Sequence, residues 1–168
     1  LVGEGTWRAT HGLFAYDATL RVPLIFWAKG ALRPAVSHAP SRLVDLMPTI
    51  LDLVGVSVPP GMNGRSLRTV PDRAGPADDP GTYFEALNAN LTRSWAPLKG
   101  MVHDRWKVID LPIPELYNRA ADSGERANLF EQRKDVAASL QRGLSALRAN
   151  AAPAAPGRSR YSGWSRRS

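Results

Sequence analysis

The sequence of 168 residues contains no cysteine, only three histidines and no long apolar run. Without cysteine the chain can form no disulfide bond, thiolate metal site or cysteine nucleophile. No stretch approaches the roughly 18 consecutive apolar residues of a membrane-spanning helix, so we expect no membrane span. The histidines, His11, His38 and His103, are too far apart in sequence to indicate a metal-binding motif. A Walker-type phosphate loop and a G-x-S-x-G nucleophile elbow are also absent.

Positive charge is concentrated at the end of the sequence. The net charge is +7, and four arginines without any acid lie in residues 151–168, which leaves +3 on the rest. This segment is biased towards Ala, Pro, Gly, Ser and Arg, so we expect a disordered basic tail. Such a tail can contact any polyanion, which leaves a noncatalytic polyanion-binding module as one interpretation of the chain. The aromatic and basic residues at 95–110 fit a packed hairpin better than a specific nucleic-acid interface.

Two apolar patterns in the first third of the chain predict a strand and a helix. Residues 20–28, LRVPLIFWA, are apolar at nearly every position after Arg21, which is typical of a strand covered on both faces in a mostly parallel sheet. Residues 46–54 have one apolar face, with Pro48 in the first turn and Gly55 after the last one, and predict a helix. A strand buried on both faces needs neighbours, and no other segment obviously supplies them.

The second half of the chain predicts a small antiparallel unit and a helix. Residues 82–87 have the composition of a strand, and residues 97–111 predict a hairpin that turns at residues 103–105. We expect a loop with caps and turns at residues 114–130 and an amphipathic helix at residues 133–150. The order of these elements indicates an α/β fold that continues into an α+β unit.

Few side chains carry recognisable chemistry. His11 precedes Gly12 in a loop just before the expected strand, where residues of α/β sheets often line a site. From composition alone, a loop histidine that bonds to the backbone is the simpler interpretation. Asp17 and Arg21 are four positions apart, and we expect a structural ion pair between them. His103 is expected in an exposed turn.

Four motifs in series resemble the C-terminal portion of sulfatases. GEGTWRATHGLFAYDATLRVPLIFWAKG resembles a family segment with G-E-H-G, a THG or KG element, a tyrosine–acid pair and R-V-P-L-I. VDLMPTILDLVGVSVPPGMNGRSL resembles the next block, and YFEAL resembles the strand after it. HDRWKVID and ELYNRAADSGERANL resemble the last block, a hairpin followed by E-L-Y and an acidic turn. Each motif is modest alone, but the four follow in unbroken order over about residues 3–130.

The resemblance implies an α/β fold of the alkaline-phosphatase-like superfamily. This chain would form a C-terminal fragment of its mixed sheet, with a small antiparallel C-terminal subdomain and a packed helix. The family hydrolyses sulfate esters: a formylglycine hydrate attacks sulfur, a calcium ion acts as Lewis acid and cationic side chains neutralise the sulfate. His11 matches the Lys or His before Gly that contacts the sulfate, and Asp17 and Arg21 correspond to scaffold positions. Glu85 lies in the strand near the family's substrate side and is a candidate substrate contact.

The departures from the family pattern define what this chain would lack. The formylglycine motif Cys/Ser-x-Pro-x-Arg and the acidic residues that hold calcium are absent, and GEG stands where the family has G-E-H-G. HAPSR around His38 resembles the nucleophile motif by chance, because histidine cannot be converted to formylglycine. We therefore expect a C-terminal fragment that is inactive alone, and whose partner would be a missing N-terminal portion. A phosphate- or phosphonate-ester hydrolase or transferase of the same superfamily stays open.

The expected organisation follows from these blocks. Residues 1–75 would be the end of the sulfatase catalytic domain, residues 76–150 the C-terminal subdomain and residues 151–168 the disordered basic tail. The intact enzyme would act on a sulfate ester, and aryl, choline and glycan sulfates are all compatible with the sequence.

Overall fold

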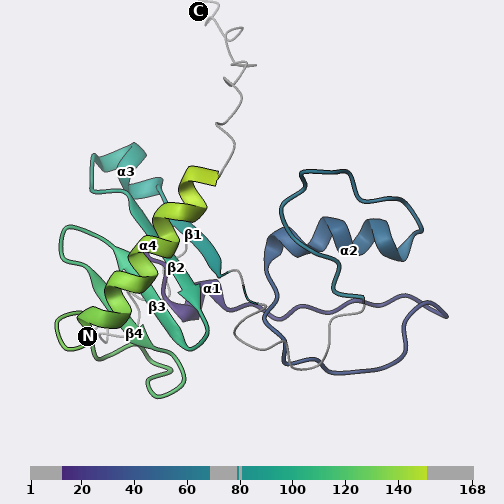
Figure 1. The fold of residues 1–168 in the computed structure, drawn as a ribbon, viewed down its shortest axis with the longest axis horizontal. Helices are drawn as coiled ribbons and strands as arrows, with labels where there is room; N and C mark the ends of the chain where they lie inside the picture. The colour runs from purple at the N-terminus through teal and green to yellow at the C-terminus, as the bar shows by residue number, and fades with distance from the viewer. Residues whose placement is uncertain (1–12, 69–78, 80, 151–168) are drawn as a thin grey trace, which may run out of the picture.

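The computed structural model describes residues 13–68, 79 and 81–150. A four-stranded antiparallel sheet with a long helix on one face forms the larger part, and a smaller lobe surrounds a second helix (Figure 1). The elements in chain order are α1 (Asp17–Leu20), the 3-10 helix η2 (Leu43–Asp45), α2 (Leu46–Leu53), β1 (Thr82–Ala86), α3 (Asn88–Arg93), β2 (Leu98–His103), β3 (Trp106–Asp110), β4 (Glu115–Asn118) and α4 (Lys134–Asn150). His11 and the expected tail at 151–168 lie outside the described residues. No helix within the described part of the chain is long and apolar enough to cross a membrane.

The strands follow chain order across the sheet, β1-β2-β3-β4, and every neighbouring pair is antiparallel. β2 and β3 form the predicted hairpin, in which His103 faces Trp106 and Asp104 adopts a left-handed conformation with φ 51°. Gly100 on β2 lies opposite Phe84 on β1, and a Cβ at Gly100 would lie 2.2 Å from the Phe84 ring. The ring therefore occupies space that only a glycine leaves open on the neighbouring strand.

Each face of the sheet has its own hydrophobic core, because successive side chains of a strand point to opposite faces. α4 covers the first face (Figure 1), and its apolar side chains pack on the strands. This α4-covered core consists of Met101, Val108, Leu116, Ala137, Leu140 and Leu144. Gly143 lets α4 approach closely, since a Cβ there would lie 3.0 Å from the Met101 sulfur. The core of the second face consists of Ala15, Phe84, Leu98, Ile109 and Tyr117, so residues 13–20 pack on that face.

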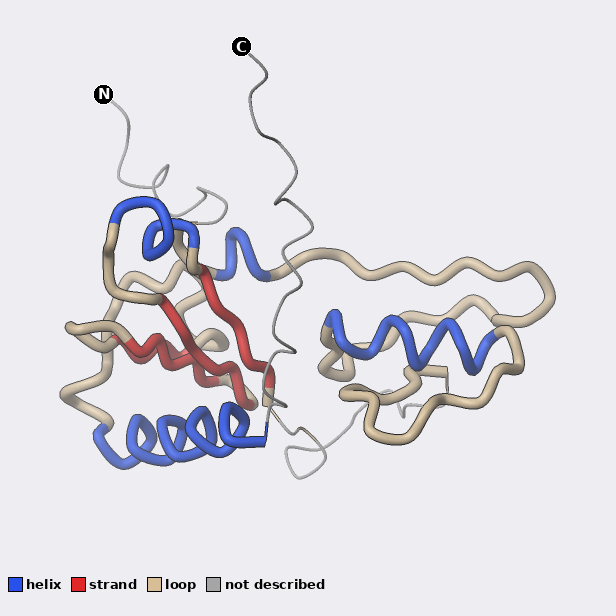
Figure 2. The backbone as a smooth tube through the Cα atoms, turned by 90° about the horizontal axis from the view of Figure 1, so that it is seen from above, coloured by secondary structure: helices blue, strands red, loops and turns tan. Residues whose placement is uncertain are grey.

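The strand expected at residues 20–28 is not formed. After α1 the chain runs away from the sheet as a long loop that leads to the lobe around α2 (Figure 2). Ile25 and Trp27 are each 84% exposed. A strand forms only where a neighbour satisfies its backbone N–H and C=O groups, and within the described ranges the sheet contains only β1 to β4. The prediction of a buried strand here was therefore wrong for this chain.

The other elements are largely as expected. The helix predicted at 46–54, the strand at 82–87, the hairpin and the helix at 133–150 are confirmed by α2, β1, β2 with β3, and α4. β4 lies inside the segment expected to be a loop, and α3 was not predicted. The antiparallel sheet with its packed helix confirms this part of the expected fold class.

The second sequence block builds the lobe around α2. The carboxylate of Asp45 is completely buried and accepts hydrogen bonds from the Arg42 backbone N–H (2.9 Å), from Nε and Nη2 of the same arginine (3.2 and 2.9 Å), and from the Arg65 backbone N–H (3.0 Å). Thr49 Oγ1 donates to the Asp45 carbonyl at 2.6 Å and accepts from the Leu67 backbone N–H at 3.0 Å. These bonds fasten the loop after α2 back onto the helix, so the acid and the threonine of this motif have a structural role.

Candidate functional site

Residues 13–20 are the described part of the chain next to the predicted sulfate contact, His11, which lies outside the described residues. Ala15 is 1% exposed in the second-face core, and Tyr16 and Leu20 pack against that core. The single turn of α1 is closed by the Arg21 backbone N–H, which donates to the Asp17 carbonyl at 2.9 Å. This segment is thus fixed to the sheet by apolar contacts and by the charged groups around Lys107.

Lys107 on β3 is completely buried beneath residues 13–20. Its ammonium donates to the Ala15 carbonyl at 2.9 Å and to Asp17 Oδ1 at 3.3 Å, and it forms an ion pair with Glu125 Oε1. The rings of Tyr16 and Phe84 each have their centroids 5.7 Å from the same nitrogen. Three oxygen atoms thus surround the ammonium, two of them as hydrogen-bond acceptors and the Glu125 oxygen as an ion-pair partner.

The two acids of this cluster are joined by further bonds. Glu125 Oε2 accepts the Asp17 backbone N–H at 2.7 Å, and Arg119 Nε donates to Asp17 Oδ2 at 2.8 Å. Two cations and two carboxylates therefore form one network, the Lys107 network, which consists of Asp17, Lys107, Arg119 and Glu125. The charges balance, and paired groups of this kind act as structural links.

The expected ion pair between Asp17 and Arg21 was wrong, because Asp17 pairs with Lys107 and Arg119 instead. The partners lie 90 and 102 positions away in sequence, beyond the reach of a local pattern. The sequence contains one indication that Lys107 is buried. It stands between apolar residues in β3 and two positions before Ile109, so strand alternation places it on an inward face.

A second polar cluster joins the same segment to β4. The hydroxyl groups of Tyr16 and Tyr117 both donate to Glu115 Oε2, at 3.2 and 2.9 Å. Burial, reinforced by the Glu115 charge, raises the pKa of Tyr117 well above its usual value. The hydroxyl of Tyr117 therefore stays protonated and acts as a hydrogen-bond donor over the physiological range.

Glu85, the predicted substrate contact, lies on β1 and is exposed. It faces Lys99 across the strand pair, on the side of the sheet that α4 covers, and its Oε2 accepts from the Tyr83 hydroxyl at 2.6 Å. Burial and this hydrogen bond raise the pKa of Tyr83 to about 12. Residues 13–20 pack on the opposite face, so the sheet separates Glu85 from the described part of the His11 loop.

The remaining histidines are at separate places. His38 is exposed in the loop between α1 and η2, and His103 ends β2 beside the hairpin turn, half-buried. Within the ranges that the structure describes, no group of three or more His, Asp or Glu side chains could hold a metal ion. The described residues therefore do not fit the calcium ion that the sulfatase resemblance implies.

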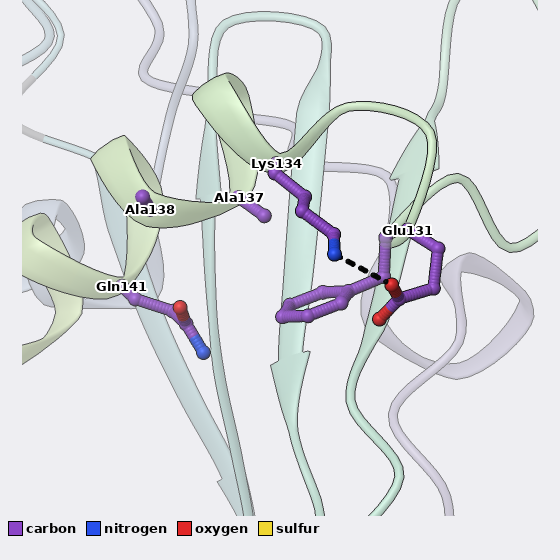
Figure 3. A pocket seen from close by; sticks show the side chains of 6 residues that line it. Glu131, Lys134, Ala137, Ala138 and Gln141 are labelled. Carbon is purple, nitrogen blue, oxygen red and sulfur yellow. Dashed lines mark ion pairs between the residues drawn. The ribbon is translucent and has the colours of Figure 1, made fainter.

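A shallow pocket of ≈ 290 Å³ lies beside the first turns of α4. Its walls are the side chains of Phe130, Glu131, Lys134, Ala137, Ala138 and Gln141. Figure 3 shows the Lys134 ammonium reaching towards the Glu131 carboxylate, with which it forms an exposed ion pair at 3.0 Å. The charged groups of this pocket are thus paired with each other, and its lining contains no nucleophile with an adjacent base.

The comparisons with known proteins agree with the sulfatase resemblance. The family model described as "N-sulphoglucosamine sulphohydrolase, C-terminal" matches residues 4–150. An N-acetylglucosamine-6-O-sulfatase of Bacteroides thetaiotaomicron is 32% identical over 139 residues, which are 76% of this chain and 25% of the relative. Mouse arylsulfatase K is 25% identical over 154 residues, with 83% of this chain and 27% of the relative covered. The chain thus spans about a quarter of the length of these relatives.

Two solved structures have similar folds. The phosphonate monoester hydrolase SpPMH of Silicibacter pomeroyi aligns with a TM-score of 0.64 and 26% identity, over 82% of this chain and 31% of that one. BT4656, solved in complex with its substrate D-glucosamine-2-N,6-O-disulfate, aligns with a TM-score of 0.53 and 28% identity, over 63% of this chain and 23% of that one.

Proposed function

The chain belongs to the family of C-terminal N-sulphoglucosamine sulphohydrolase regions, and from this membership we propose that it forms the C-terminal part of an enzyme that hydrolyses sulfate esters. The observation that carries the proposal is the match of the family model over residues 4–150, which includes the THG element and the sheet. Residues 1–75 would complete a catalytic domain, residues 76–150 would be the C-terminal subdomain and residues 151–168 a basic tail.

The exposed apolar surface of the α2 lobe supports a covalently or noncovalently attached N-terminal portion. Leu43, Met47, Ile50 and Val54 are spaced by three or four residues and are 75, 55, 47 and 66% exposed. At this spacing they form one stripe along η2 and α2, the α2 stripe, which in a water-exposed helix is unfavourable. In the loop that leads to this lobe, Val22, Leu24, Ile25 and Trp27 are exposed as well. Relatives four times as long have the additional chain that would cover such surfaces.

His11 would contact the sulfate group of the substrate. An imidazole N–H donates a hydrogen bond to a sulfate oxygen, and a protonated ring adds a positive charge. Such a donor stabilises the negative charge on oxygen as the ester bond breaks. Glu85 stays a predicted substrate contact, and its position on the α4 side of the sheet makes it the weaker candidate.

The catalytic nucleophile and the calcium ligands would come from the attached N-terminal portion. In the intact enzyme calcium would polarise the sulfate, but the described residues form no site for it. We therefore expect Leu1–Ser168 alone to be inactive towards sulfate esters.

A phosphonate monoester hydrolase is the second candidate. The alignment with the Silicibacter pomeroyi enzyme covers more of this chain than the alignment with BT4656, at similar identity. The two candidates share the fold and differ in the group that the substrate carries, so a protein that includes the N-terminal portion should be assayed with an aryl sulfate and with an aryl phosphonate monoester.

Chemical modification of His11 tests the proposed sulfate contact in the chain itself. Diethyl pyrocarbonate acylates accessible imidazole nitrogens, and mass spectrometry separates the peptides of the three histidines. Sodium sulfate should slow the modification of His11 relative to sodium chloride of equal ionic strength, while His38 and His103 serve as internal controls. Equal rates at His11 in both salts would contradict the proposed role of this residue.

A further inference from the structure

We infer that Lys107 is a positioning residue for the proposed sulfate contact: its network fixes the chain segment that follows His11 to the sheet. The inference rests on the proposed function of His11. His11 stands four positions before Ala15 in the sequence, and the Ala15 carbonyl accepts a hydrogen bond from the Lys107 ammonium at 2.9 Å.

The contacts of Lys107 are directed at this one segment. Its two hydrogen-bond acceptors, the Ala15 carbonyl and Asp17 Oδ1, belong to residues 13–20. Its ion-pair partner Glu125 accepts a hydrogen bond from the Asp17 backbone N–H of the same segment. Tyr16 places its ring beside the ammonium as well. The interactions of one buried cation therefore converge on three consecutive residues, Ala15 to Asp17.

Apolar packing alone would fix residues 13–20 only weakly to the sheet. Ala15 is the one fully buried side chain of residues 13–20, Tyr16 and Leu20 pack against the core only partly buried, and α1 is a single turn with no buried residue. A short turn of this kind has little stability of its own, so its position depends on tertiary contacts. The Lys107 network supplies directional contacts, and a carboxylate or carbonyl that loses the ammonium is left without its charged partner in a buried place.

The glutamate of the network is also built into the fold. Glu125 is 2% exposed and adopts a left-handed conformation with φ 51°, which is unfavourable for a residue with a Cβ. The turn that holds it is closed by the Glu125 backbone N–H, which donates to the Asp122 carbonyl at 3.1 Å. The acidic turn of the last sequence block therefore presents a carboxylate to Lys107, which gives this motif a role in holding the distant N-terminal segment.

Hydrogen exchange of the full chain tests whether Lys107 fixes residues 13–20 to the sheet. In Lys107→Met, the backbone amides of residues 13–20 should exchange about 100-fold faster, the scale expected when a buried ion pair loses one partner, while β2 and β3 stay protected. If the single variant fails to fold, Lys107→Met combined with Glu125→Gln removes the unpaired charge, and the amides of residues 13–20 should still exchange faster. Unchanged exchange of residues 13–20 in a folded variant would overturn the inference.

The effect of sulfate on the modification of His11 tests whether Lys107 influences the proposed sulfate contact. Lys107→Met should reduce or abolish the protection of His11 by sulfate that the parent chain shows. Leu144→Ala is the matched control, because it destabilises the α4-covered core on the opposite face and should leave the protection intact. Protection that is equal in Lys107→Met and the parent would overturn the inference. A parent chain without protection would contradict the His11 contact itself, while the exchange data would still decide whether Lys107 holds the segment.

Discussion

The Lys107 ammonium on β3 forms an ion pair with the Glu125 carboxylate, and neither side chain has more than 2% of its surface in contact with water. A buried pair of this kind offsets the cost of removing both charges from water only if every remaining donor and acceptor is satisfied. Here the Ala15 carbonyl and Asp17 Oδ1 each accept a hydrogen bond from the ammonium. The pair thus connects three distant parts of the sequence in the second-face core.

Removal of Glu125 should be far more costly than removal of Arg119. Glu125→Ala leaves the buried Lys107 cation without its main partner, and we expect a loss of about 3–5 kcal/mol in the free energy of unfolding. The Arg119 side chain is 26% exposed, and Arg119→Ala should cost only about 1 kcal/mol, since water screens a partly exposed pair. Urea denaturation of the two variants measures the difference. Similar losses in both would show that burial does not decide the strength of this network.

Gly64 should be irreplaceable in the α2 lobe. It adopts φ +106°, and a Cβ there would lie 2.2 Å from the Val44 carbonyl oxygen. Gly64→Ala should therefore destabilise the lobe by roughly 2–4 kcal/mol, from backbone strain and overpacking together. Gly61 is the control: it has φ +81° but no atom within 4 Å of a Cβ, so Gly61→Ala should cost only about 1 kcal/mol. Hydrogen exchange of η2 and α2 gives the readout, and equal effects would contradict the close approach at Val44.

Tyr117 should make the fold sensitive to alkaline pH. Its pKa is raised above the ordinary value of 10, mainly by burial and then by the Glu115 charge. A group whose pKa is higher in the folded than in the unfolded state contributes stability that is complete below the unfolded pKa and is lost as the pH rises above it. The free energy of unfolding should therefore fall above about pH 10, and Tyr117→Phe should flatten this decline. Parallel pH profiles of parent and variant would contradict the prediction.

The α2 stripe should contribute little to the stability of the isolated chain. Met47→Gln with Ile50→Gln should change the free energy of unfolding by less than about 0.5 kcal/mol, because both side chains are already exposed. Leu140→Ala, in the α4-covered core, should cost about 2–5 kcal/mol. Sedimentation should also show less self-association in the double variant, since an exposed apolar patch promotes association. A large loss of stability from the double variant would indicate that the stripe is already buried within this chain.

Local patterns in the sequence were sufficient for the elements that carry their own signal. The hairpin of β2 and β3, the helix α2 and the helix α4 follow from alternation, helical spacing and their turn residues, because these features act over a few positions. The expected strand at residues 20–28 failed because its apolar pattern describes an environment that this chain does not supply. β4 has only four residues, and its assignment depends on pairing with β3.

The candidate site was less predictable than the fold. The resemblance singled out His11 and Glu85, but it gave no indication that Lys107, Glu125 and Asp17 meet on one face of the sheet. Their contacts join positions up to 108 residues apart, and charge pairs at such distances follow from the register of the sheet rather than from any local spacing. The position of Lys107 in the alternating pattern of β3 was the one indication in the sequence that its side chain points into the core.

The most direct test of the proposed function is an assay of two proteins with an aryl sulfate in the presence of calcium: Leu1–Ser168, and the longer product that results when the reading frame is extended upstream of Leu1. We predict a Cys/Ser-x-Pro-x-Arg motif in the added sequence, turnover of the aryl sulfate by the longer protein and none by Leu1–Ser168. Turnover by Leu1–Ser168 alone would contradict the account, and so would a longer protein that has no such motif and hydrolyses neither an aryl sulfate nor an aryl phosphonate.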